Sequence, residues 1–127
     1  MMRVSGWQWR LQTLALLLWM TLPCARAADF PLADGDYIFQ HRYAEQPLMD
    51  SFQLQVEIRF PRIRVYNRDY AGVFPLGLVD DAELYWHQPS QQWILVHDEQ
   101  DKQASEVGGC SDGPGVIDAQ ARIYWTC

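Results

Sequence analysis

The chain has few basic residues, no long apolar segment and only three cysteines, and these shortages exclude several classes of protein. It carries 10 Lys and Arg residues against 16 Asp and Glu residues, for a formal net charge of −6. Phosphate binding needs clustered positive charge, so the composition argues against a nucleic-acid partner. The most apolar stretch, residues 11–22, is about a dozen residues long, short of the roughly 20 that a membrane-spanning helix needs. We therefore expect a protein that neither binds nucleic acid nor spans a membrane.

The first 27 residues have the three parts of a secretory signal peptide. Arg3 and Arg10 make a positive start, residues 11–22 are apolar, and Ala25-Arg26-Ala27 is an A-x-A cleavage signal. We expect cleavage directly after this signal. The remaining residues, 28–127, are enough for one small domain and no more. The protein is therefore expected to be exported, to the periplasm or to the extracellular space.

Cys24 leaves one alternative open for the leader. A lipoprotein signal has small residues just before the cysteine that becomes lipidated, whereas Leu22-Pro23 precede this one. We therefore favour a cleaved signal peptide, with lipid modification at Cys24 as the alternative.

Removal of the leader makes the protein more acidic. Arg3, Arg10 and Arg26 leave with it and no acidic residue does, so seven basic residues face sixteen acidic ones and the net charge becomes −9. Such a charge keeps an exported protein soluble. It is also compatible with a basic partner.

Two cysteines follow the leader, Cys110 and Cys127. Exported proteins fold in an oxidising compartment, where an even number of cysteines indicates a disulfide. Closing a loop of about 17 residues contributes on the order of 3 kcal/mol in the chain-entropy model. A domain of about 100 residues has a thin core, so we expect this disulfide to hold down the C-terminal strand.

Short alternating segments separated by turn residues dominate the rest of the chain. No long amphipathic helix and no internal repeat is present, which favours a mainly β fold: a small antiparallel β-sandwich or barrel of about six or seven short strands, stapled by one disulfide. Pro61 interrupts the alternation and predicts a bulge or a tight corner. Residues 98–106 form either one or two helical turns or a loop. The expected strands lie at 36–42, 54–60, around Ile63 and Val65, at 82–87, at 92–97 and at 122–127, with a short edge segment at 73–77.

The hairpin and the last strand carry the most specific expectations about packing. Residues 82–87 and 92–97 are joined by a loop of hairpin length. In the last strand Ile123, Trp125 and Cys127 share one parity, which points all three inward. Three tryptophans remain after the leader is removed, and each shares a parity with an apolar residue, so we expect Trp86, Trp93 and Trp125 to fill the core.

Residues 109–113 read Gly-Cys-Ser-Asp-Gly, a literal G-x-S-x-G. In serine hydrolases this pattern forms the nucleophile elbow between a strand and a helix. Here Asp112-Gly113-Pro114-Gly115 follows the serine and cannot begin a normal helix, and Cys110 is the expected disulfide partner. We interpret the glycines as turn residues and expect no catalytic role for Ser111.

Four of the seven mature basic residues fall within ten positions: Arg59, Arg62, Arg64 and Arg68. They are the candidate partner-binding residues, as a patch for an anion or an acidic partner. The alternative is that Arg62 and Arg64 pair across the sheet with Asp80, Asp81 or Glu83.

Neither a metal nor a cofactor is expected. His87 and His97 end the two hairpin strands, and in an antiparallel pair these positions lie at opposite ends, so they cannot share an ion. The sequence matches no family motif that would assign catalytic residues.

We therefore expect a small exported, non-enzymatic binding protein of the cell envelope, whose ligand is another protein or a cell-wall component. One alternative is an inhibitor of a basic hydrolase such as lysozyme, by analogy with other small acidic envelope proteins. A second is a small hydrolase that uses Ser111 or a His–Asp pair, and a third is a structural envelope component.

Overall fold

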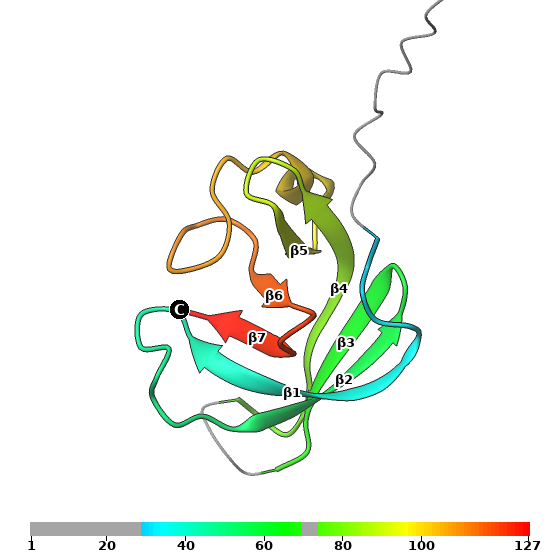
Figure 1. Ribbon diagram of the computed structural model, residues 1–127, viewed down its shortest axis with the longest axis vertical. Coiled ribbons are helices and arrows are strands. Elements are labelled where there is room, and N and C mark those ends of the chain that lie inside the picture. The colour runs from blue at the N-terminus through cyan, green and yellow to red at the C-terminus, as the bar shows by residue number, and fades with distance from the viewer. Residues whose placement is uncertain (1–28, 70–73) are drawn as a thin grey trace, which may run out of the picture.

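The computed structural model describes residues 29–69 and 74–127. The expected signal peptide, its cleavage site and Cys24 lie outside these residues. Within them, seven strands form one closed β-barrel and the only helix is a short 3-10 helix (Figure 1). The fold is mainly β, as the alternation predicted, and it is a barrel rather than a sandwich. The elements are β1 (Gly35–Tyr43), β2 (Gln53–Arg59), β3 (Arg62–Asn67), β4 (Gly77–His87), β5 (Gln92–Val96), η1 (Glu99–Gln103), β6 (Val116–Asp118) and β7 (Ile123–Thr126).

Strand pairing follows the order of the chain. Each strand from β1 to β6 pairs antiparallel with the next one, and β7 closes the barrel by pairing parallel to β1. The pairings of β5 with β6 and of β6 with β7 join only two residue pairs each. Inside the described ranges, no helix is long and apolar enough to cross a membrane.

The alternating residues of β2 and β3 build the centre of the core. Val56 lies opposite Val65 and Ile58 opposite Ile63 in the register, and all four side chains are buried. The two strands are joined by a turn at residues 60–61, so the interruption at Pro61 is the predicted tight corner. Burying one apolar face of each strand fixes the register, because a slip of one residue would expose every core side chain.

The predicted hairpin is present, and its first strand is longer than expected. β4 and β5 pair from Glu83 with Val96 to His87 with Gln92. β4 begins at Gly77, and residues 74–76 form no strand. The expected edge segment at 73–77 was therefore wrong for its described part, because Gly77 already belongs to the strand that pairs with β3.

The expected inward parity of the last strand was wrong. Tyr124 is the β7 residue that faces the barrel core, with 6% of its surface exposed. Ile123 and Trp125 therefore face outward, and Trp125 packs against a second apolar cluster formed by Ile94, Val96 and Val116. The apolar pattern correctly indicated that Trp125 is partly buried, but the cluster that buries it lies outside the barrel.

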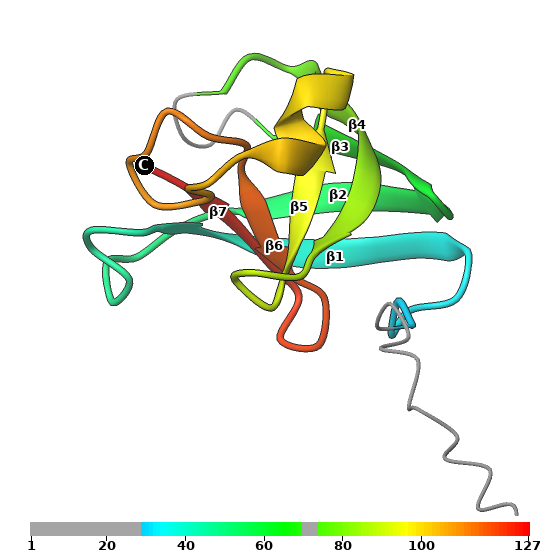
Figure 2. The ribbon, with the colours of Figure 1, turned by 90° about the horizontal axis from the view of Figure 1, so that it is seen from above.

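A long excursion between β5 and β6, residues 97–115, produces this second core. Figure 2 shows η1 and the following loop lying beside β5 and β6. The Asp98 side chain caps η1 by accepting the Gln100 N–H, and the Asp101 carboxylate accepts the Asp98 backbone N–H. This region therefore contains a short helical segment. Val107 packs on the outer face of β5 and β6. Both faces of β5 are therefore buried, in contrast to the half-buried strands elsewhere.

The predicted disulfide ties this excursion to the end of the chain. Cys110 and Cys127 are bonded, with Cα atoms 4.7 Å apart. Cys127 follows the outward parity of Trp125, so the outward face of β7 is what allows it to reach the excursion loop.

Aromatic side chains close both ends of the barrel. At the end where β1 begins, the ring of Phe30 lies 5.5 Å from that of Phe60 and 5.1 Å from that of Trp93. At the opposite end His41 stacks on Phe52 with ring centroids 4.7 Å apart. Apolar and aromatic side chains of the described residues therefore pack the interior of the barrel.

Candidate binding site

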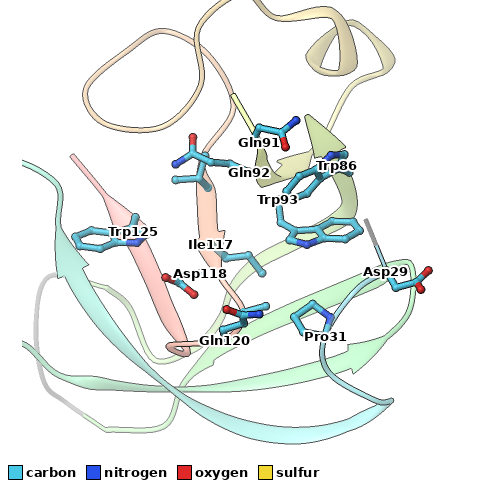
Figure 3. Close-up of a pocket in the computed structure, with 12 residues that line it drawn as sticks. Asp29, Pro31, Trp86, Gln91, Gln92, Trp93, Ile117, Asp118, Gln120 and Trp125 are labelled. Carbon is cyan, nitrogen blue, oxygen red and sulfur yellow. The ribbon is translucent and has the colours of Figure 1, made fainter. Parts of the chain in front are cut away.

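A pocket of about 350 Å³ lies at the end of the barrel where the N-terminal segment, the β4–β5 turn and the β6–β7 turn come together (Figure 3). Small-molecule sites usually measure about 300–1,000 Å³. We call it the tryptophan pocket, because its lining brings together all three tryptophans of the described residues. Its aromatic and polar lining consists of Trp86, Trp93, Trp125, Gln91, Gln92, Gln120, Asp29 and Asp118.

The pocket reaches from the barrel mouth around β6 to the outer surface. Figure 3 shows Trp86 and Trp93 on one side of β6 and Trp125 on the other. β6 has only three residues, with Ile117 in the barrel core and the flanking Asp118 exposed. Because β6 is so short, one pocket includes residues from both sides of this strand.

Two of the three rings form a fixed pair. Trp86 and Trp93 are cross-strand partners in the hairpin, and their ring centroids lie 5.4 Å apart at 62°. Trp93 is only 8% exposed and packs edge-on against Phe30. Trp93 was therefore correctly predicted as core, whereas Trp86 and Trp125 are only partly buried beside the two clusters.

Several polar groups of the pocket have no hydrogen-bond partner among the residues that the structure describes. The Trp86 indole N–H donates to Gln88 Oε1 at 3.1 Å. Among residues 29–69 and 74–127, the indole N–H groups of Trp93 and Trp125 find no acceptor, and the side-chain amides of Gln92 and Gln120 make no hydrogen bond. These donors and acceptors are available to a ligand.

The lining carries negative charge only. Of the described residues that line it, Asp29 and Asp118 are the charged ones, and none is a Lys, Arg or His. Asp118 Oδ1 accepts the backbone N–H of Ala121 at 2.8 Å, which fixes the β6–β7 turn. An anionic ligand would therefore meet repulsion and no compensating cation.

The four arginines do not form one free patch. Arg62 and Arg64 lie 2.8 and 3.5 Å from the two carboxylate oxygens of Asp81, which is one of the cross-strand pairings considered above. Arg59, Arg62, Arg64 and Glu57 line a shallow depression of about 130 Å³, which we call the arginine dent.

Arg68 lies at the far end of β3 from the other three arginines. Its guanidinium stacks over Tyr66, 4.4 Å from the ring centroid, and donates to Gln55 Oε1. These contacts hold the side chain against the sheet.

Ser111 occupies a turn inside the excursion. Its hydroxyl donates to the Gly108 carbonyl at 2.7 Å and accepts the Gly113 N–H at 3.3 Å. Glycine is favoured at three positions of this turn for two different reasons. Gly108 and Gly109 adopt positive φ angles of 65° and 55°. A Cβ on Gly113 would lie 1.7 Å from the Glu106 carbonyl oxygen. Both hydrogen bonds of the Ser111 hydroxyl are typical of a turn residue.

A His–Asp pair that sequence reasoning did not locate lies at the other end of the barrel. His97 Nε2 and Asp80 Oδ1 are 2.5 Å apart, and the Tyr124 hydroxyl donates to Asp80 Oδ2 at 2.8 Å. Burial, followed by the charge of Asp80, raises the pKa of Tyr124, so this hydroxyl stays protonated. In the described part of the chain no serine, threonine or cysteine bonds to His97.

The other two histidines are buried. His87 Nε2 faces the Ala104 carbonyl oxygen at 2.7 Å and must donate to it, so Nδ1 accepts the Ser90 hydroxyl. His41 bonds to Ser51 and Thr126 at 2.9 and 2.8 Å. Burial lowers the pKa of His41 below its ordinary value of 6.5.

Acidification should therefore destabilise the fold. Below pH about 6.5 the unfolded chain takes up a proton at His41 that the folded chain resists, so the free energy of unfolding falls as the pH is lowered through this range. Urea unfolding between pH about 7.5 and 5 measures the slope, and NMR titration of the His41 ring locates its pKa. A ring that titrates at or above 6.5 in the folded protein would contradict this account.

The fold and the pocket together define a small disulfide-bonded β-barrel with an aromatic and amide-lined pocket at one end. A scan against protein-family models, a search of curated proteins and a search of solved structures found no match to this chain.

Proposed function

We propose that the chain is an exported, non-enzymatic binding protein of the cell envelope and that the tryptophan pocket is its binding surface. The observation that carries this proposal is the grouping of three tryptophans, three glutamines and two aspartates around one pocket. Their spacing in the sequence does not require this grouping. Large aromatic side chains beside unpaired polar groups are typical of binding sites.

Export is the other half of the proposal. The A-x-A signal at residues 25–27 and the disulfide between Cys110 and Cys127 are both expected of a protein that matures outside the cytoplasm. N-terminal sequencing of the protein from the periplasmic or extracellular fraction tests it, and we expect a mature N-terminus at Ala28. A lipid-modified Cys24 would move the protein to a membrane surface.

Retention of envelope material on the immobilised mature protein tests the binding function. Trp125→Ala should reduce retention about tenfold, because one stacking surface is lost. Tyr85→Ala is the matched control, since Tyr85 is an exposed ring on β4 that does not line the pocket. Arg59→Ala tests the arginine dent. Loss of retention in Arg59→Ala with full retention in Trp125→Ala would contradict the proposal.

Two alternatives predict different results in the same preparation. An inhibitor of a basic hydrolase such as lysozyme would use the net charge of −9, so its binding should weaken strongly with salt and should suppress the activity of the enzyme. A hydrolase that uses Ser111 would convert a generic ester and lose this activity in Ser111→Ala. We expect neither behaviour, because the pocket is largely uncharged and Ser111 is bonded within a turn.

A further inference from the structure

The described residues of the tryptophan pocket offer ring faces, hydrogen-bond donors and acceptors but no positive charge. We infer that the ligand of this pocket is an uncharged oligosaccharide, a short stretch of a glycan chain. This inference rests on the proposed function, because it names the ligand class of the same pocket. It follows from three properties of the lining, taken in turn below.

The unpaired polar groups match hydroxyls. The indole N–H groups of Trp93 and Trp125 can only donate, whereas the amides of Gln92 and Gln120 can both donate and accept. None of these four groups is hydrogen-bonded to another residue of the described chain. A sugar hydroxyl both donates and accepts, so it can satisfy either kind of group. A compact cation would use acceptors only.

The rings are spread along the pocket rather than gathered around one point. Trp86 and Trp93 form an edge-to-face pair, and Trp125 lies on the other side of β6 (Figure 3). A cage for a quaternary ammonium group surrounds a single centre with aromatic faces. Separated rings instead suit a chain of pyranose units, because each unit presents an apolar C–H face for packing and a polar rim for hydrogen bonds.

The charge of the pocket excludes an acidic ligand. Asp29 and Asp118 are both exposed, and no basic side chain lines the pocket within residues 29–69 and 74–127. A glycan with carboxylate or sulfate groups would bring like charges together. The arginine dent that could attract an anion is lined by a separate set of residues on β2 and β3.

Calorimetric titration of the mature protein with defined probes tests the inference. The neutral probes are cellotriose, maltotriose and N-acetylchitotriose; trigalacturonate is the anionic probe and choline the cationic one. At least one neutral trisaccharide should bind with a dissociation constant on the order of 0.1–1 mM. This value should be unchanged between about 50 and 500 mM salt, because no charge pair forms. Trigalacturonate should bind at least about tenfold more weakly, and choline should not bind.

Variants locate the binding. Trp125→Ala should weaken the neutral probe about tenfold. The pair Gln92→Ala and Gln120→Ala changes exposed side chains only and should also weaken binding of the neutral probe. This pair keeps the test valid if the Trp125→Ala variant does not fold. Tyr85→Ala should bind as the wild type does.

The inference is overturned if no neutral trisaccharide binds, or if trigalacturonate or choline binds more tightly. If envelope material is still retained in a Trp125-dependent way, the pocket is the site and only the ligand class is wrong. If retention does not depend on Trp125, both the inferred ligand class and the proposal that the tryptophan pocket is the binding surface fail.

Discussion

Reduction of the Cys110–Cys127 disulfide should lower the melting temperature by more than about 10 °C. The bond closes a loop across a sequence separation of 17 residues, and such a loop contributes about 3 kcal/mol to the free energy of unfolding. For a domain of about 100 residues each kcal/mol corresponds to about 4–8 °C. The loss is amplified locally, because the bond holds the excursion over the second apolar cluster and anchors β7, which closes the barrel against β1.

Calorimetry with and without reductant measures this effect. The double variant Cys110→Ser and Cys127→Ser is the control and should melt at the lower temperature in both conditions. Two titratable thiols in the native protein, or a melting temperature that reductant leaves unchanged, would contradict the account. Cys110 would then be free beside Ser111, and that turn would have to be reconsidered as a reactive site.

Replacing Gly113 with alanine should destabilise the fold by about 2 kcal/mol or more. A Cβ at this position would lie 1.7 Å from the Glu106 carbonyl oxygen and 2.8 Å from its carbonyl carbon. Both atoms belong to the backbone, so the loop itself must move to make room. The loop carries Cys110, and its displacement therefore also strains the attachment of β7.

Two neighbouring substitutions serve as controls for Gly113→Ala. Gly109→Ala meets no atom within 4 Å but must keep φ at 55°, which costs about 1–2 kcal/mol. Ser111→Ala loses the hydrogen bond to Gly108, worth about 1 kcal/mol. Urea unfolding should rank Gly113→Ala as the most destabilising of the three. A Gly113→Ala variant as stable as Ser111→Ala would show that the close approach to Glu106 is not a constraint.

The fold class and the strands could be predicted because alternation and turns are local properties. Leu54, Val56 and Ile58 alternate with polar residues, and the strand they predict is present with the same face buried. The disulfide could be predicted as well, because only two cysteines follow the leader. These features need no knowledge of which strands become neighbours.

The parity of β7 could not be interpreted from the sequence alone. An apolar row of Ile123 and Trp125 indicates burial but not the partner. Here Trp125 packs against a cluster outside the barrel, against which Val107 of the excursion also packs. Burial of both faces of β5 has the same origin. A single alternating pattern does not distinguish an inner core from an outer one.

The pocket could not be predicted for a related reason. Its lining comes from the N-terminal segment, the β4–β5 hairpin, β6, the β6–β7 turn and β7, and only closure of the barrel brings these together. Each tryptophan was individually expected in the core, and for Trp93 this is correct. The candidate arginines were recognisable as a cluster, but the contacts of Arg62 and Arg64 with Asp81 appear only in the register of β3 with β4.

The most direct test of the central claim is a ¹⁵N NMR spectrum of the mature protein, with and without soluble glycan-rich envelope extract. The three tryptophans of residues 28–127 give three indole N–H signals. Those of Trp93 and Trp125 should shift together and exchange more slowly with solvent, since their N–H groups are free in the pocket. The Trp86 signal should change less, because its N–H is already bonded to Gln88. Shifts confined to Arg59, Arg62 and Arg64, with all three indole signals unchanged, would contradict the claim that the tryptophan pocket is the binding surface.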